Sequence, residues 1–162
     1  NGLITPNAGI DKSNIKYGKA VLYPRKPDSS ALYIRDGLKF RRGVDVGVVL
    51  SDSRLMPTRR GTTGVTVAAA GLEGILDLRG TPDLFGNILR VTSQAIADDL
   101  SSAAQLVMGE AKESTPIVLI RGLNGRLFKS GTYQAQDFSI PSNECVYMRS
   151  MGSTLKRSHS SS

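Results

Sequence analysis

The sequence predicts a mixed α/β domain of the α+β class, in which helices and strands pack in layers. Short apolar runs of strand length, chiefly residues 44–50, 65–70 and 117–120, alternate along the chain with two longer segments that have helical periodicity. Such a succession is typical of a layered structure. The chain has 162 residues, of which 40% are hydrophobic, and this is enough for one domain with a true core.

The run 44–50 is the most informative of these strands, because polar residues follow it at once. Asp52 and Ser53 come almost directly after it, and Arg54 and Arg59 lie shortly beyond. In open α/β sheets, ligands bind beyond the carboxyl ends of the strands, and a carboxylate, a hydroxyl and guanidinium groups suit a metal ion and phosphates. We therefore expect a buried strand that ends in a metal- and phosphate-binding segment. A surface turn with solvated charges is the alternative.

The N-terminal region, residues 1–14, is rich in turn-forming residues. Asp11 and Asn14 are three positions apart, so one turn can place both side chains on the same side. An ordinary turn with a solvated aspartate is the alternative at this point. A strand is expected over residues 19–23, where Pro24 ends it.

Two helices are expected. The first follows Pro27, with Asp28 or Ser29 as its N-cap, and the second has Thr92 or Ser93 as its N-cap. One apolar face of each helix is suited to packing on a sheet. These faces consist of Ala31, Ile34 and Leu38 in the first helix, and of Ile96, Leu100, Ala103, Ala104 and Val107 in the second.

The remaining elements lie between and after these helices. Residues 65–70 predict a strand of small residues against which another element packs closely. A long polar loop, 71–86, and a short strand, 88–91, precede the second helix, which ends at Gly109. The strand 117–120 follows, and a strand or turn is expected at 138–140.

Composition excludes several classes of protein. The net charge of +7 permits anionic partners, but aromatic residues are only 6% of the chain and do not interleave with basic residues, which disfavours a nucleic-acid-binding module. The lone cysteine, Cys145, excludes an intrachain disulfide and fits a cytoplasmic protein. Neither a signal peptide nor an apolar run of membrane-spanning length is present. Phosphate-loop, dinucleotide-binding, serine-hydrolase and zinc motifs are absent.

Several motifs occur together in a fixed order. They are NAGIDKSN, YPRKPDSSA, GVVLSDSRLMPTRRGTTGV, RGTPDLFGNILRVTSQAIADDLSSAAQLVMGE and TPIVLIRG. In this order and spacing, over residues 7–121, the chain resembles the coenzyme F420-0:L-glutamate ligase family. The segment 140–144, IPSNE, is a weaker echo of the C-terminal end of that family.

The resemblance implies a ligase whose fold forms an intertwined homodimer. In that family, GTP phosphorylates a carboxylate of the F420 precursor, F420-0, and the amine of L-glutamate attacks the acyl phosphate to form an amide bond. Two divalent ions, Mn²⁺ or Mg²⁺, lie beside the nucleotide, and K⁺ is a further cofactor that the resemblance allows. Such ions bridge phosphate oxygens and neutralise charge on the transferred phosphoryl group.

The resemblance also implies roles for particular residues. Asp11 and Asp52 correspond to the aspartates of the first ion, and Ser53, where the family usually has threonine, and Glu110 correspond to the ligands of the second ion. We take Asp52 and Arg59 as the catalytic candidates and add Arg54 and Arg121 as candidates for phosphate or carboxylate contacts. The implied nucleotide-binding residues are Asn14, Met108, Gly109, Glu110, Ala111, Lys112, Glu113, Ser114 and Thr115.

Two departures from the family pattern leave alternatives open. This chain has SDSRLMPTR where the family often has SDTFGRPWR, so the acceptor substrate is open to change. The chain begins at Asn1 without the N-terminal portion of the family pattern, so we expect a fragment, or a chain that takes the missing portion from another chain. The alternative function is a non-catalytic nucleotide- and metal-binding subunit. Within the chain, residues 1–148 are expected to form a ligase-like core and residues 149–162 a disordered, basic, serine-rich tail.

Overall fold

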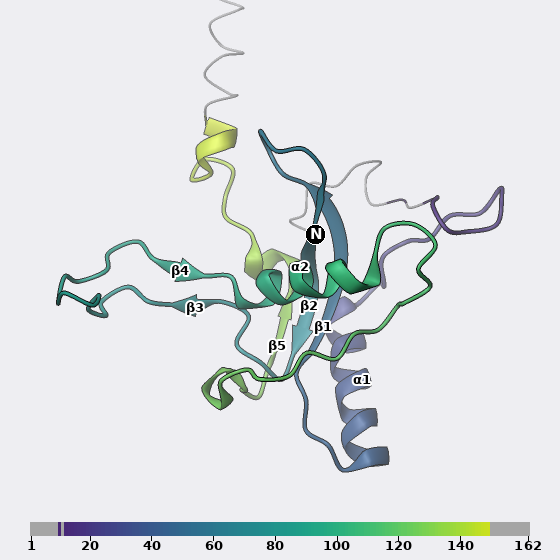
Figure 1. The fold of residues 1–162 in the computed structure, drawn as a ribbon, viewed down its shortest axis with the longest axis horizontal. Helices are drawn as coiled ribbons and strands as arrows, with labels where there is room; N and C mark the ends of the chain where they lie inside the picture. Colours follow the sequence, from purple (N-terminus) through teal and green to yellow (C-terminus); the bar gives the residue numbers. More distant parts are fainter. Residues whose placement is uncertain (1–9, 11, 150–162) are drawn as a thin grey trace, which may run out of the picture.

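The computed structural model describes residue 10 and residues 12–149. Asp11 and nearly all of the predicted tail therefore lie outside the described residues. The centre of the fold is a three-stranded antiparallel sheet in the order β1-β2-β5, formed by β1 (Val48–Leu55), β2 (Thr62–Ala70) and β5 (Thr132–Gln134). Two helices, α1 (Pro27–Arg42) and α2 (Ile96–Met108), pack beside it (Figure 1). The expected α+β class is confirmed.

The two helices cover opposite faces of the sheet, and the alanines at the end of β2 separate them. Ala69 lies in one core cluster with Ile96 and Ala97 of α2, whereas Ala68 and Ala70 lie in a second cluster with Ala31 of α1. Alternation along a strand sends neighbouring residues to opposite faces. The close packing expected over residues 65–70 is therefore present on both sides of the strand.

A β-bulge in β2 sets which residues face each helix. Leu50 pairs with Ala68 and Ser51 pairs with Thr66, so Val67 is an extra residue on the β2 side. Thr66, whose hydroxyl lies 3.0 Å from that of Ser101, faces α2 just as Ala69 does, although the two are an odd number of positions apart. The bulge thus changes the alternation within the strand.

Helix α1 begins one residue earlier than its expected cap. Pro27 is the first helical residue and Lys26 the N-cap, with no capping hydrogen bond from a side chain, so the prediction of Asp28 or Ser29 as N-cap is wrong. Proline suits this position because its missing N–H would have no helical partner. Gly43 ends the helix in a left-handed conformation, with φ 65°.

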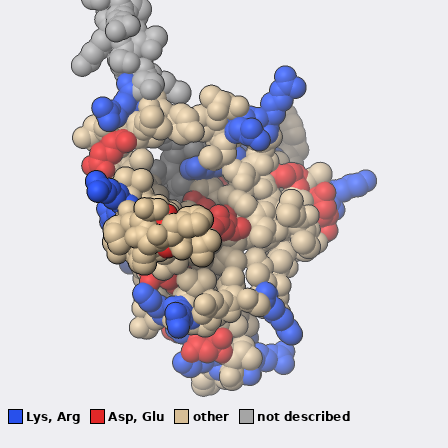
Figure 2. Space-filling view, turned by 60° about the vertical axis from the view of Figure 1, so that its left-hand side comes forward, with Lys and Arg blue, Asp and Glu red and all other residues tan. Residues whose placement is uncertain are grey.

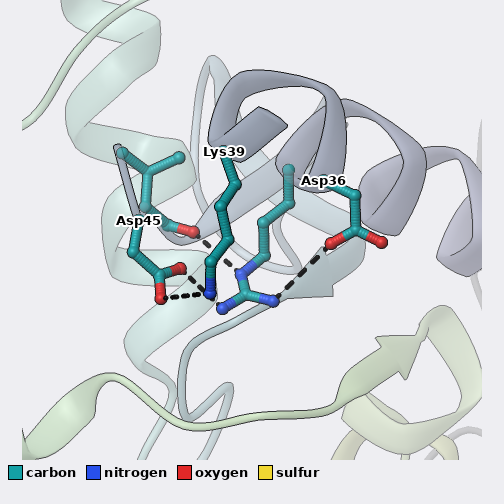
Figure 3. A network of polar contacts seen from close by, with 5 residues as sticks. Asp36, Lys39 and Asp45 are labelled. Carbon is teal, nitrogen blue, oxygen red and sulfur yellow. Dashed lines mark hydrogen bonds and ion pairs between the residues drawn. The ribbon is translucent and has the colours of Figure 1, made fainter. Parts of the chain in front are cut away.

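The connection from α1 to β1 is fixed by a network of polar contacts (Figure 3). Arg35 donates from Nε to the Val46 carbonyl at 3.2 Å and from Nη2 to the Asp45 carboxylate at 2.6 Å, and Lys39 donates to the same carboxylate at 3.2 Å. The hydrogen bond from Lys39, more than the charge of Arg35, lowers the pKa of Asp45. These cations therefore have structural partners.

Helix α2 begins after Ala95, so the prediction of a cap at Thr92 or Ser93 is wrong. Ser93 instead belongs to β4 (Ser93–Gln94), which pairs with β3 (Leu76–Asp77). Gly109 ends the helix as expected. The first turns of its predicted apolar face are packed in the core, whereas Val107 is 60% exposed.

Residues 76–94 form an arm rather than a loop followed by a strand. Beyond β3 and β4, the arm is held by a bridge between Pro82 and Ile88 and by backbone hydrogen bonds (Figure 1). At its tip, the Asp83 carboxylate accepts from the N–H groups of Phe85 and Asn87 at 2.9 and 2.8 Å. The strand predicted at 88–91 is wrong, because Ile88 forms only that single bridge.

Two other predicted strands do not form. Residues 19–23 contain one bridging residue, Val21, and residues 117–120 have no regular secondary structure. The chain after α2 returns through two short 3-10 helices, η2 (Gly125–Leu127) and η3 (Ala135–Phe138), so the expected turn near 138–140 is a helical one. No helix in the described part of the chain combines the length and the apolar character needed to cross a membrane.

Candidate functional site

Asp52 and Ser53 lie in the middle of β1, not beyond its end. Strand β1 runs from Val48 through both residues to Leu55, where Asp52 pairs with Val65 and Ser53 pairs with Gly64 of β2. The strand is half-buried, and its neighbour is antiparallel. The argument from the carboxyl end of a buried strand in an open α/β sheet is therefore wrong, while the metal-binding role of the two residues stays a prediction.

Asp52 and Ser53 point to opposite faces of the sheet. A Cβ atom at Gly64 would lie 2.4 Å from the carbonyl carbon of Ser101, so this position of β2 faces α2. Residues directly opposite one another in an antiparallel pair share a face. Ser53 therefore lies on the α2 face, and Asp52 lies on the face of α1.

The surroundings of Asp52 agree with this assignment. Its carboxylate is half-buried and accepts a hydrogen bond on Oδ2 from the hydroxyl of Tyr23, a residue of the segment that leads into α1. In the described part of the chain, the acids that form ion pairs are Asp36, Asp45, Glu73 and Asp77. The carboxylate of Asp52 is thus held by a neutral donor.

Side chains of α2 close the free edge of β2 beside Ser53. The Asp98 carboxylate accepts from the Thr66 N–H at 2.8 Å, and the Ser102 hydroxyl donates to the Gly64 carbonyl at 3.1 Å. Strand β5 pairs only with the far end of β2, so these side chains replace a missing strand. Asp98, in the first turn of α2, therefore binds the sheet.

Glu110 comes two residues after the end of α2, and its contacts lead to the β1–β2 hairpin. Its Oε1 accepts from the side-chain amide of Gln105, which also donates to the Thr62 hydroxyl at 3.5 Å. Thr62 is the first residue of β2 and pairs with Leu55 at the end of β1. A chain of contacts therefore places Glu110 on the α2 side of the β1–β2 hairpin, the side to which Ser53 points.

The predicted nucleotide-binding segment, 108–115, is a compact exposed turn. Glu113 folds back so that its carboxylate accepts from the Ala111 N–H at 2.8 Å, and the Thr115 hydroxyl donates to the Glu113 carbonyl at 3.1 Å. Gly109 and Ser114 take left-handed conformations, with φ of 71° and 53°. The segment, which contains Glu110, therefore turns sharply at both positions.

The other candidates belong to other segments of the chain. Arg54 is the next-to-last residue of β1. Arg59 lies between β1 and β2, where its backbone N–H donates to the Met56 carbonyl at 3.2 Å. Asn14 is exposed in a left-handed turn, with φ 50°, and Arg121 is exposed. On the face shown in Figure 2, Lys and Arg side chains are spread around the rim and form no single patch.

The donor chemistry fits hard divalent cations. Carboxylates and a hydroxyl suit Mg²⁺ or Mn²⁺, and the acids Asp52 and Glu110 are not neutralised by an ion pair among the described residues. In residues 10 and 12–149, no group of three or more His, Cys, Asp or Glu side chains could hold a metal ion. An ion held by this part of the chain would therefore have at most two acidic ligands from it.

A hollow that no sequence pattern predicted lies at the base of the arm. Its volume is about 470 Å³, within the range of small-molecule sites. It lies between the start of α2, the β3–β4 pair and η2. Its walls are mainly leucine and isoleucine side chains with a few polar groups, namely Leu76, Gln94, Ile96, Asp99, Leu100, Leu123, Asn124, Arg126 and Leu127.

The matching family model and three similar proteins are all named as glutamyl or glutamate ligases of coenzyme F420. The model of the F420-0:Gamma-glutamyl ligase family matches residues 1–122. The coenzyme F420:L-glutamate ligase of Methanopyrus kandleri is 44% identical over 126 residues, which are 78% of this chain and 50% of the relative. The ligase of the same name from Methanothermobacter thermautotrophicus is 46% identical over 122 residues, 75% of this chain and 48% of the relative.

A third relative extends the match further along the chain. The coenzyme F420:L-glutamate ligase of Methanocaldococcus jannaschii is 41% identical over 147 residues, 91% of this chain and 57% of the relative. The chain thus spans about half the length of the curated relatives it matches. Because the family model covers most of the sequence, the chain belongs to the F420-0:gamma-glutamyl ligase family.

Proposed function

We propose that this chain is part of a ligase that joins L-glutamate to a coenzyme F420 precursor through an amide bond, with GTP as co-substrate. The observation that carries the proposal is the family match over residues 1–122, which includes all of β1, α2 and the turn after α2. The names of the three relatives support the same reaction.

The proposed reaction has two steps. The γ-phosphoryl group of GTP passes to a carboxylate of the F420 precursor, and GDP leaves. The amine of L-glutamate then attacks the acyl carbon, phosphate leaves, and a proton is lost from the nitrogen. Two divalent ions, Mg²⁺ or Mn²⁺, would neutralise charge on the phosphoryl group in the first step.

The proposed ligands Asp52 and Ser53 lie on opposite faces of the sheet. Asp52 would hold one ion from the α1 side, with Asp11 as a further proposed ligand of that ion, and Ser53 with Glu110 would hold the other from the α2 side. The turn 108–115 supplies N–H and hydroxyl groups for the nucleotide, together with Asn14. Arg59 and Arg54 would bind the phosphates or the acceptor carboxylate, because guanidinium groups pair with both.

A homodimer is part of this proposal. The arm ends in Leu84 and Phe85, which are 92% and 87% exposed, and Val91 on the same arm is 88% exposed. Large apolar side chains gathered on a projecting element are typical of a protein–protein interface. A second copy of the chain is the partner that the family fold implies.

GDP release measured in a coupled assay tests the proposed reaction. Release that requires both L-glutamate and a deazaflavin acceptor, and that is lost in Asp52→Asn, is the expected result. The exposed Asp36 of α1 offers a matched control, Asp36→Asn, which should retain the activity. Binding of GTP and Mn²⁺ with no acceptor-dependent turnover would exclude the ligase and support the non-catalytic nucleotide-binding subunit.

A further inference from the structure

Asp52 and Glu110, two of the acids proposed as metal ligands, share one feature of their surroundings. The carboxylate of Asp52 accepts from the Tyr23 hydroxyl, and that of Glu110 accepts from the Gln105 amide. Both donors are neutral. The chain has 21 Lys and Arg residues against 14 Asp and Glu residues, and the acids that form ion pairs in its described part are four others: Asp36, Asp45, Glu73 and Asp77.

A neutral donor and a cation affect a metal ligand differently. A cation beside a carboxylate competes electrostatically with an incoming divalent ion. A hydroxyl or amide fixes the orientation of the carboxylate and leaves its charge in place. Outer hydrogen-bond partners of this kind orient the ligands of metal sites, and their loss typically weakens metal binding by about 10–100-fold.

The backbone of both donor residues, Tyr23 and Gln105, is conformationally restricted. Tyr23 precedes Pro24, which restricts it to extended conformations. Gln105 lies in the last turns of α2, and its amide also reaches the Thr62 hydroxyl at 3.5 Å. Because little conformational freedom remains to be lost, each donor holds its carboxylate in one orientation before any ion arrives.

We propose that Tyr23 and Gln105 are positioning residues, which orient the carboxylates of Asp52 and Glu110 toward divalent cations. The inference rests on the proposed metal-binding function of those acids. In Asp52 the oxygen that accepts the hydrogen bond is Oδ2, and in Glu110 it is Oε1.

The absence of tryptophan from the sequence makes a direct spectroscopic test available. Tb³⁺ replaces hard divalent cations and emits when a nearby tyrosine is excited. The 162-residue chain should sensitise Tb³⁺ emission, and Mn²⁺ should displace it. Tyr23→Phe should lower the emission per bound ion strongly and weaken Mn²⁺ binding about tenfold or more. Tyr33→Phe, at an exposed tyrosine of α1, should change neither.

The second acid is tested separately by calorimetry with Mn²⁺. Gln105→Leu keeps the size of the side chain but removes the donor, and should weaken one class of Mn²⁺ site about tenfold or more. Gln136→Leu, at an exposed glutamine, is the matched control. Thermal unfolding without metal separates the roles, because a purely structural glutamine would lower the melting temperature and leave Mn²⁺ affinity unchanged.

The outcomes separate the inference from the function on which it rests. If the parent chain binds no Mn²⁺, or Asp52→Asn and Glu110→Gln bind it as the parent does, the proposed metal site is wrong and the positioning roles are wrong with it. If those variants lose Mn²⁺ but Tyr23→Phe and Gln105→Leu bind Mn²⁺ with the affinity of the parent, the site stands and the positioning roles are overturned. Should Tyr23→Phe fail to fold, Gln105→Leu decides the question.

Discussion

Replacing Gly64 with alanine should strain the contact between β2 and α2. The added Cβ atom would lie 2.4 Å from the carbonyl carbon and oxygen of Ser101 and 2.7 Å from the amide nitrogen of Ser102. Carbon atoms in contact are about 3.5–4.0 Å apart, so the helix must retreat by about 1 Å. All three atoms belong to the backbone of α2, and no side-chain rotation can relieve the clash.

Two effects should lower the stability of the Gly64→Ala variant. Inserting one carbon into a packed contact typically costs about 1–3 kcal/mol. A retreat of α2 also lengthens the hydrogen bonds between Asp98 and Thr66, between Ser102 and Gly64 and between Ser101 and Thr66, each worth about 1 kcal/mol. A loss of about 3 kcal/mol lowers the melting temperature of a chain of this size by about 6–12 °C.

Thermal unfolding followed by circular dichroism measures the change. The matched control is Gly37→Ala, which makes the same substitution inside α1 at a position where nothing lies within 4 Å of the new atom. It should raise stability by about 0.5–1 kcal/mol, because alanine loses less backbone freedom than glycine in a helix. A Gly64→Ala variant that melts at or above the parent temperature would refute the direct contact between α2 and the β1–β2 hairpin.

Three further changes test other parts of the molecule. Asp83→Ala removes the acceptor of the N–H groups of Phe85 and Asn87. Amide hydrogen exchange at the arm tip should therefore be faster in the variant than in the parent, while α2 stays protected; unchanged exchange at the tip would contradict the turn. Replacing Leu84 and Phe85 together by serine should weaken the proposed dimer in sedimentation and change monomer stability by less than about 0.5 kcal/mol; unchanged sedimentation would remove the arm from the interface. Hydrogen bonds from Lys129 and then Tyr133 lower the pKa of Glu73 below its usual 4.5, so its stabilising effect is present above pH 4.5 and is lost as pH falls through the folded pKa. In urea unfolding, the difference between the parent and Glu73→Gln should therefore shrink toward acid, and a constant difference would contradict the pairing.

Local signals were sufficient to predict the helices and the central strand. Pro27 at the start of α1 and Gly109 at the end of α2 act through their own backbone chemistry, so they mark those ends whatever surrounds them. The N-caps were harder to predict. Thr92 and Ser93 are good capping residues, but their segment pairs with β3 and the helix starts later.

The predicted strands that do not form show that an apolar run alone does not determine whether a strand forms. Residues 117–120 have the composition of a buried strand, yet Ile117 and Leu119 are 84% and 67% exposed and no strand pairs with them in the described part of the chain. Periodicity reports a side-chain pattern, whereas a strand also needs a partner for its backbone groups. That partner is a property of the fold and cannot be inferred from the run itself.

The same limit applies to the candidate site, and here the pairing changes the chemistry that is available. A binding segment beyond the end of the strand, as expected from the sequence, would have let Asp52 and Ser53 approach one ion together. An extended strand separates them, because adjacent side chains point to opposite faces. Which face meets α2 then depends on the pairing of Ser53 with Gly64, where the absent side chain lets the helix backbone approach. The division of the two residues between two proposed ions therefore requires β1 to stay extended through both of them.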